Sequence, residues 1–245
     1  NAAQNSLVAM AAIDGLPLYS LVVRADLRKN ISRIDDLKGR RIGVHSDSPI
    51  AITTSRQILN LVLGSRGISP SEVSIIPAGQ SWDSQSSVFL TRTADAIMSD
   101  EPLATRFTLE KLGGTIYSTG NKSDISTTPG AGFLRATLIA RRNKVERNSE
   151  LSMRMVKVVQ RSLAYMASRK APELADLMAL QGAERLSFIN VFEQFPDQYS
   201  RDAKFSRAQL KDTEIFTRHA NPGIAGVLQY AVDQMVIDRW AGSKP

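Results

Sequence analysis

Residues 41–112 alternate between short apolar runs and segments that carry helix start and stop signals, and this alternation limits the possible fold most strongly. Three buried strands are predicted, at residues 41–44, 73–76 and 94–98. A helix is predicted after each strand, at residues 48–64, 83–90 and 101–112, with prolines near the starts and glycines at two of the ends. Three strand–helix pairs in succession predict a parallel sheet covered by helices on both faces.

The flanking sequence adds further elements. The predictions are a strand at 21–23, a helical turn closed by glycine at 35–39, a polar loop at 119–132 and a strand at 134–140. The chain is predicted to be helical after Glu146, with further helices near residues 171–181, 184–193, 206–218 and 223–240. Four apolar residues with helical spacing are expected to face the core, namely Met155, Val159, Leu163 and Met166.

The composition excludes several kinds of site. The 245 residues include no cysteine and only two histidines, His45 and His219. Disulfides, thiolate nucleophiles and zinc–thiolate sites are therefore excluded, and no metal or cofactor is predicted. The longest apolar run, at residues 7–13, is far shorter than the roughly 18 residues needed to span a bilayer.

The charge of the chain favours an anionic partner over a cationic one, since the formal net charge is +7. The basic residues are scattered, however, and only 6% of the residues are aromatic. Binding of single-stranded nucleic acid needs a basic groove with stacking side chains, so no nucleic-acid binding is predicted. The charge is interpreted as a solvated surface, with a small anionic ligand as the alternative.

Motifs of common enzyme sites are missing from the sequence. It contains no G-x-S-x-G elbow and no glycine-rich phosphate loop of either common type. His45, Ser46 and Asp47 are neighbours along the chain, whereas a catalytic triad needs residues that converge in space. We therefore predict a protein without catalytic activity.

Three phrases between residues 21 and 102 resemble the NMT1/THI5-like family, which includes the nitrate-, taurine- and alkanesulfonate-binding proteins of ABC importers. They are L-V-V-R at 21–24 with I-D-D-L-K-G-R-R-I-G-V at 34–44, the turn H-S-D-S-P at 45–49, and A-D-A at 94–96 with E-P at 101–102. The phrase around residues 37–44 is the most specific of these. Arg92 departs from the family pattern, which usually has glycine at that position.

The resemblance implies an α/β fold of the periplasmic-binding-protein type (type II, Venus flytrap), in which two lobes close on a ligand. It implies one lobe from residues 1–41 and 136–245 and a second lobe from residues 42–135. Hinges are expected near residues 40–42 and 133–136. The strand–helix–strand unit with which the family begins is expected to be missing.

Ligands of open α/β sheets lie at the carboxyl ends of strands, and most of the candidate residues are chosen there. The candidate ligand-binding residues are Ser46, Asp47, Ser48, Trp82, Asp100 and Glu101, together with Asp14 and Tyr19, which are chosen by family position. Purely structural roles are the alternatives: a helix cap for Ser48, core packing for Trp82, and interaction with a helix dipole for Asp100 and Glu101. Serine hydroxyls beside the N–H groups of a helix that starts at Pro49 favour an anion.

Together these features predict the solute-binding component of an ABC importer. We expect a periplasmic or otherwise extracytoplasmic monomer that binds a small anionic or zwitterionic ligand, such as a sulfonate or nitrate, and delivers it to a membrane permease. Attachment through a lipid anchor is left open. Two alternatives remain: an enzyme of the same fold, of the menaquinone- or pyrimidine-biosynthesis type, and a ligand-sensing domain. Pyrimidine synthases of this type use a cysteine-rich motif, which this chain lacks.

Overall fold

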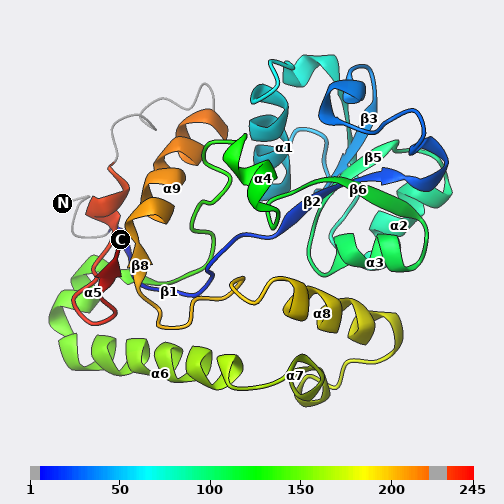
Figure 1. Cartoon of the computed structure of the whole chain (residues 1–245). Coiled ribbons are helices and arrows are strands. Elements are labelled where there is room, and N and C mark those ends of the chain that lie inside the picture. Colours follow the sequence, from blue (N-terminus) through cyan, green and yellow to red (C-terminus); the bar gives the residue numbers. More distant parts are fainter. Residues whose placement is uncertain (1–5, 221–230) are drawn as a thin grey trace.

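A five-stranded mixed sheet forms the largest unit of the computed structural model, which describes residues 6–220 and 231–245 (Figure 1). The strand order is β4-β3-β5-β2-β6. The bounds are β2 (Tyr19–Arg24), β3 (Arg41–Val44), β4 (Ser74–Pro77), β5 (Ala96–Asp100) and β6 (Gly113–Ser118). β3 is parallel to β4 and β5, but β2 is antiparallel to both β5 and β6. The parallel sheet predicted from the strands at 41–44, 73–76 and 94–98 is therefore confirmed as β3, β4 and β5, and the strand at 21–23, for which no direction was predicted, joins this sheet antiparallel as β2.

Helices cover both faces of this sheet, as predicted. Residues that alternate along each strand divide between two cores, because successive side chains of a strand point to opposite faces. Leu21 and Val23 pack in a core that includes residues of α1 (Thr54–Gly64). Val22, between them, packs in the other core, with residues of α2 (Trp82–Leu90) and α3 (Leu103–Leu109). All six residues of β2 are buried, as expected for a strand covered on both sides.

Asp95, the aspartate of the A-D-A phrase, ties β3 to the start of β5. Its carboxylate accepts hydrogen bonds from the Arg41 backbone N–H (3.0 Å) and from two nitrogens of the Arg41 guanidinium (3.2 and 2.8 Å). The buried guanidinium of Arg24 lies 3.7 Å away and also pairs with Asp26 at 2.7 Å. Burial opposes ionisation of Asp95, but the Arg41 hydrogen bonds outweigh it and lower the pKa of this carboxyl.

A second unit contains a two-stranded antiparallel sheet of β1 (Leu7–Ala12) and β7 (Thr137–Arg141). Its apolar cluster includes residues of β1, β7 and three of the surrounding helices. The remaining elements are α4 (Lys122–Ser126), α5 (Arg142–Arg147), α6 (Ser149–Ala167), α7 (Ala171–Leu177), α8 (Gly182–Gln194), β8 (Phe205–Ser206), α9 (Arg207–Ala220), β9 (Ser243–Lys244) and the short 3₁₀ helices Ala25–Leu27, Ile34–Leu37, Pro70–Glu72 and Val232–Met235. In Figure 1, α6, α7 and α8 follow one another below the five-stranded sheet, and α8 contacts α3.

The chain passes between the two sheets twice, through residues 13–18 and 119–136. Asp14 joins these two passages, because its carboxylate oxygens accept the backbone N–H groups of Arg135 (3.1 Å) and Ala136 (3.0 Å). The Ile13 N–H also donates to the Ala136 carbonyl (2.9 Å). Desolvation of the buried Asp14 carboxyl raises its pKa.

The division into lobes 1–41 plus 136–245 and 42–135 stays a prediction, as do its hinges. The strand pairing bears on its first boundary, since β2 shares a sheet with β3, β5 and β6. A division that keeps this sheet whole moves that boundary from residue 41 to the passage at residues 13–18. The second predicted boundary, at residues 133–136, falls in the other passage.

Several local predictions need correction. The helix predicted to start at Pro49 starts instead at Thr54, with Thr53 as its N-cap. β6 follows α3 where only a helix end at Gly113 was predicted, and α4 lies within the predicted loop 119–132. Met155 was expected in the core but is 43% exposed, whereas Leu163 is buried as predicted and α6 also buries Ser152 and Val156. Residues 223–230 of the helix predicted at 223–240 lie outside the described residues, and the described remainder, residues 231–240, contains only a short 3₁₀ helix, Val232–Met235.

Candidate functional site

Four side chains from distant parts of the sequence meet where β3 and β5 end and β2 begins. We call Tyr19, His45, Asp100 and Arg135 the strand-end cluster. Asp100 is its centre: one carboxylate oxygen lies 3.4 Å from His45 Nε2, and the other lies 3.6 Å from the Arg135 guanidinium. The Arg135 guanidinium also stacks over the Tyr19 ring, 5.0 Å from its centroid. Antiparallel pairing places Tyr19 directly opposite Asp100 and puts both side chains on one face of the sheet.

A buried glutamine positions the imidazole of His45. The Gln85 amide nitrogen, on α2, lies 2.5 Å from His45 Nε2, and Gln85 Oε1 accepts the Ser99 hydroxyl at 2.8 Å. The Gln85 side chain therefore contacts both His45 at the end of β3 and Ser99 in β5, which fixes the position of the imidazole. The His45 backbone N–H donates to Ser55 Oγ (3.2 Å), which links the end of β3 to the first turn of α1.

Tyr19 and Arg135 have different exposures and different chemistry. Burial raises the pKa of Tyr19 to about 12, so its hydroxyl remains a neutral hydrogen-bonding group next to Thr54 at the start of α1. The Arg135 side chain is 44% exposed, and its 3.6 Å distance to Asp100 is too long for a hydrogen bond. A planar guanidinium with free N–H groups can bind an oxyanion through two parallel hydrogen bonds.

The turn after β3 holds the three residues that were predicted to cradle an anion. Ser46 is buried, and its hydroxyl donates to the Ser48 carbonyl (2.6 Å) and accepts the Ser48 N–H (3.0 Å). The Ser48 hydroxyl accepts the Ile50 N–H at 3.4 Å, and Asp47 is exposed. The expectation that Ser48 caps a helix was wrong, because Thr53 caps α1. Ligand contact by these three residues stays a prediction.

Trp82 and Glu101 interact with α3. Trp82 packs against Phe107, with ring centroids 4.9 Å apart, and the Arg106 guanidinium lies 4.1 Å from its ring centroid. Glu101 accepts the Thr105 backbone N–H (2.8 Å) and the Ser20 hydroxyl (3.1 Å). Both residues therefore have the structural roles named as alternatives, and their predicted contact with a ligand is untested.

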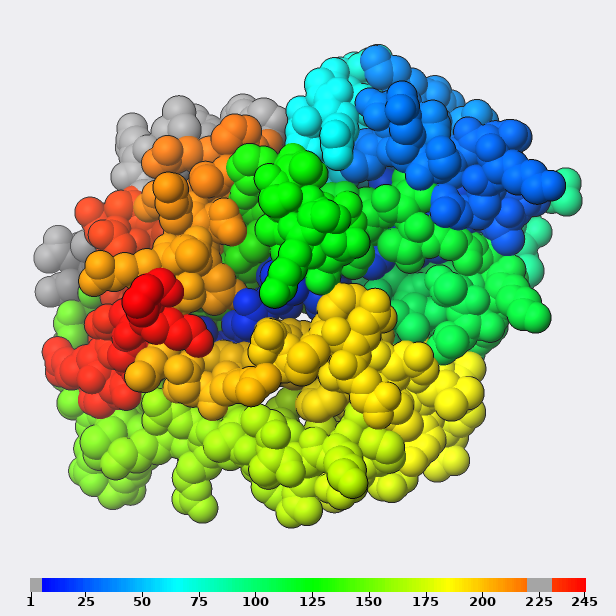
Figure 2. All heavy atoms as spheres, in the orientation of Figure 1, coloured from blue at the N-terminus to red at the C-terminus, as the bar shows by residue number. Residues whose placement is uncertain are grey.

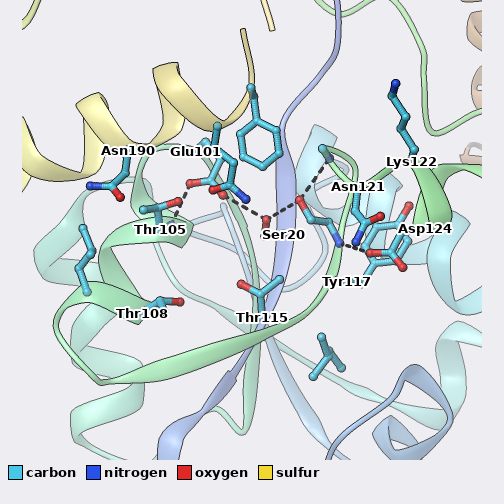
Figure 3. A pocket seen from close by; sticks show the side chains of 16 residues that line it. Ser20, Glu101, Thr105, Thr108, Thr115, Tyr117, Asn121, Lys122, Asp124 and Asn190 are labelled. Atoms are coloured by element: carbon cyan, nitrogen blue, oxygen red, sulfur yellow. Dashed lines mark hydrogen bonds between the residues drawn. The ribbon is translucent and has the colours of Figure 1, made fainter. Parts of the chain in front are cut away.

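A polar groove lies between the five-stranded sheet and α8, and we call it the α3–α8 groove. Its volume is about 800 Å³, within the range of small-molecule sites. Figure 2 shows the surface hollowed between the residues of α8 (yellow) and those of the sheet unit (green and blue). The close-up shows Glu101, Thr105 and Asn190 on one side, Ser20 at the base, and Asn121, Lys122 and Asp124 on the other side (Figure 3).

Within residues 6–220 and 231–245, no three His, Asp or Glu side chains lie close enough together to hold a metal ion. The helices of the same ranges include none with the length and apolar character needed to cross a bilayer.

The sequence matches the family model "NMT1/THI5 like" over residues 1–173. The chain belongs to this family, as the three sequence phrases indicated. No curated protein matches the sequence.

Solved structures at low sequence identity share the fold. A protein from Bordetella bronchiseptica RB50 is similar with a TM-score of 0.79 and 18% identity, over 96% of this chain and 73% of that one. The alkanesulfonate-binding protein SsuA from Xanthomonas axonopodis pv. citri, bound to MOPS, gives 0.67 and 14%, over 95% and 74%. A mutant of the desulfurization enzyme DSZB, in complex with biphenyl-2-sulfinic acid, gives 0.59 and 18%, over 97% and 78%. The periplasmic-binding-protein fold predicted from the sequence is therefore confirmed.

The cation of the strand-end cluster, Arg135, was not among the residues predicted from the sequence. Arg135 lies within the predicted hinge at 133–136, but no apolar pattern or capping signal marks it as part of a site. Its position depends on Asp14, which binds its backbone N–H from the other passage between the sheets. The one sequence signal that could have indicated Arg135 as a site residue is that it is a basic residue within a predicted hinge.

Proposed function

We propose that the chain is the solute-binding component of an ABC importer and binds a small anionic or zwitterionic ligand at the strand-end cluster. The observation that carries the proposal is the half-exposed guanidinium of Arg135 at the carboxyl ends of β3 and β5. This is where ligands of open α/β sheets bind. The similar fold of the alkanesulfonate-binding protein SsuA supports a sulfonate as the first ligand to test.

The contacts of Arg135 suit exchange with a ligand. Its guanidinium is near Asp100 but makes no hydrogen bond to it at 3.6 Å, so a sulfonate, nitrate or carboxylate can take its N–H groups without breaking a strong contact. The Tyr19 hydroxyl is a further hydrogen-bonding group in the cluster. As a component of an importer, the protein would act outside the cytoplasm and deliver its ligand to a membrane permease.

Thermal shift measurements test the proposal with methanesulfonate, ethanesulfonate, taurine, nitrate and bicarbonate. A ligand at 100 times its Kd adds about 2.7 kcal/mol of stability, which raises the Tm by about 5–10 °C for a chain of this size. We expect such a shift in the wild type and its loss in Arg135→Met.

Arg169→Met is a matched control for Arg135→Met. Arg169 has the same kinds of contact, with a tyrosine ring 4.7 Å away and a carboxylate 3.6 Å away, and its side chain is equally exposed at 45%. It lies in the connection between α6 and α7 and not at the end of a strand, so its substitution should leave the ligand-induced shift unchanged. Equal loss of the shift in both variants, or no shift with any of these ligands, would contradict the proposal.

The enzyme alternative is separated from binding by recovery of the ligand. The enzyme DSZB has a similar fold, so an enzymatic function is tested as well, although the chain has no cysteine to supply a thiolate. Ligand incubated with the protein and recovered should be chemically unchanged by mass spectrometry. Any turnover would replace the proposed function by an enzymatic one.

A further inference from the structure

Glu101 is a mostly buried carboxylate that has no cationic partner. Within the described ranges, no Lys, Arg or His nitrogen lies within 4.0 Å of its oxygens. Among the residues that the structure describes, only Ser20, through its hydroxyl, and Thr105 donate hydrogen bonds to it. Buried charges in proteins are normally paired, so an unpaired carboxylate on the wall of a groove is a candidate partner for a cation from outside.

The neighbours of Glu101 reinforce its need for a cation. Desolvation raises its pKa, and the charge of the adjacent Asp100 acts in the same direction. Asp100 itself faces His45 and Arg135 in the strand-end cluster. Of these two consecutive residues at the end of β5, Asp100 thus belongs to the strand-end cluster and Glu101 lines the α3–α8 groove.

The other walls of the groove are suited to a small organic molecule with hydrogen-bonding groups. Its charged side chains are Glu101, Asp124 and Lys122, so the two carboxylates outnumber the single ammonium. Neutral donors and acceptors come from Thr105 and Asn190, which Figure 3 shows on the same side as Glu101. This charge balance favours a cationic ligand over an anionic one.

We propose that the α3–α8 groove is a second binding site, which takes a small organic ammonium compound with its charged nitrogen against Glu101. The site is separate from the anion site proposed at Arg135 and does not rest on it. The two Glu101 oxygens have four lone pairs and accept hydrogen bonds from Ser20 and from the backbone and side chain of Thr105, so an ammonium group can add a hydrogen bond without displacing them.

Isothermal titration calorimetry tests the site with putrescine and with 1,4-butanediol, which has the same carbon chain but no charge. We expect putrescine to bind the wild type and butanediol to bind at least about tenfold more weakly, the ratio that 1.4 kcal/mol of charge-assisted hydrogen bonding gives. Glu101→Gln should weaken putrescine binding by a similar factor, because it keeps the shape and removes the charge. Glu110→Gln, at the other end of α3 and paired with Arg106, should not weaken it.

A second variant keeps the test valid if Glu101→Gln folds poorly. Asn190 is exposed on α8, so Asn190→Lys leaves the core intact and places a competing ammonium on the same side of the groove as Glu101. Loss of putrescine binding in this variant supports the site. Equal affinities for putrescine and butanediol, no binding of putrescine, or unchanged binding in Glu101→Gln and Asn190→Lys would each overturn it. None of these titrations uses an anion, so they stand whether or not the Arg135 site is confirmed.

Discussion

Replacement of Asp95 by alanine should be among the most destabilising changes of a polar residue in this chain. The Arg41 backbone N–H would lose its acceptor at the end of a buried strand, which costs about 1–3 kcal/mol. The Arg24 guanidinium, whose side chain is 11% exposed, would keep Asp26 but lose its second carboxylate. The Arg41 side chain is 44% exposed and can be hydrated, so its lost pairing adds little. We therefore expect a loss of about 3 kcal/mol in the free energy of unfolding.

Urea unfolding followed by circular dichroism measures this loss, and thermal unfolding should show a fall in Tm of about 6–12 °C. Asp35→Ala is the control, because Asp35 pairs with Arg33 on the surface, where both side chains are largely exposed, and no measurable change is expected. The pKa of Asp95 is lowered in the folded state, so its contribution is fully present above the ordinary value of 3.8 and is lost as the pH falls through the lowered value. A loss in Asp95→Ala as small as in Asp35→Ala would refute this reasoning.

Three further predictions concern helix capping, pH and backbone conformation. Thr53→Ala should lower the free energy of unfolding in urea by about 1 kcal/mol, because the Thr53 hydroxyl accepts the Arg56 N–H at the start of α1. Ser48→Ala should lower it by less, and the reverse order would support a helix start at Pro49. Burial raises the pKa of Glu101, so its contribution to stability is fully present below the ordinary value of 4.5 and is lost as the pH rises through the raised value. The urea midpoint of the wild type should therefore decline more over that pH range than the midpoint of Glu101→Gln. Equal declines in the two proteins would contradict this prediction. Gly79→Ala should lower the free energy of unfolding by about 1–2 kcal/mol, because Gly79 has φ +65° and an added Cβ would lie 2.4 Å from Ser84 Oγ. Gly64→Ala, where an added Cβ meets open space, should leave the Tm in thermal unfolding unchanged or raise it.

Four of the five strands of the sheet were predictable from their short apolar runs. Residues 41–44 and 73–76 lie within one residue of β3 and β4. The direction of β2 was not predictable, since an apolar strand has the same pattern whether it runs parallel or antiparallel to its neighbour. The start of α1 was misplaced because Ser48 and Pro49 satisfy the local rules for a helix start, while the Ser46 hydroxyl binds the Ser48 N–H in a turn.

β6 was missed for a reason that lies in the tertiary structure. Gly113 and Gly114 are typical of a helix end, but here they open a strand that packs closely on other elements. An added Cβ at Gly113 would lie 2.7 Å from the Val22 side chain, and one at Gly114 would lie 2.8 Å from Arg28. These glycines are needed for the close approach of neighbours, which the local sequence does not reveal.

The candidate site was predictable only where it depends on strand ends. Tyr19 and Asp100 were named in advance and lie opposite each other in the sheet. Arg135 and Gln85 reach the same place from a passage between the sheets and from a helix, and the sequence pattern does not fix either approach. Asp14 was named as a ligand contact, which stays a prediction, and the sequence did not reveal that its carboxylate binds two backbone N–H groups of the second passage.

The bonds of Asp14 have a mechanical consequence. If the two passages between the sheets were not bonded to each other, the two units could slide past each other by shear. Because Asp14 bonds the passages side by side, sliding is resisted and rotation is the movement of lowest energy. Relative motion of the two sheets should therefore be angular, about an axis through Asp14 and Ala136. The backbone of Arg135 is bonded to Asp14 on this axis, so its guanidinium would stay near Asp100 while surfaces farther from the axis move apart or together.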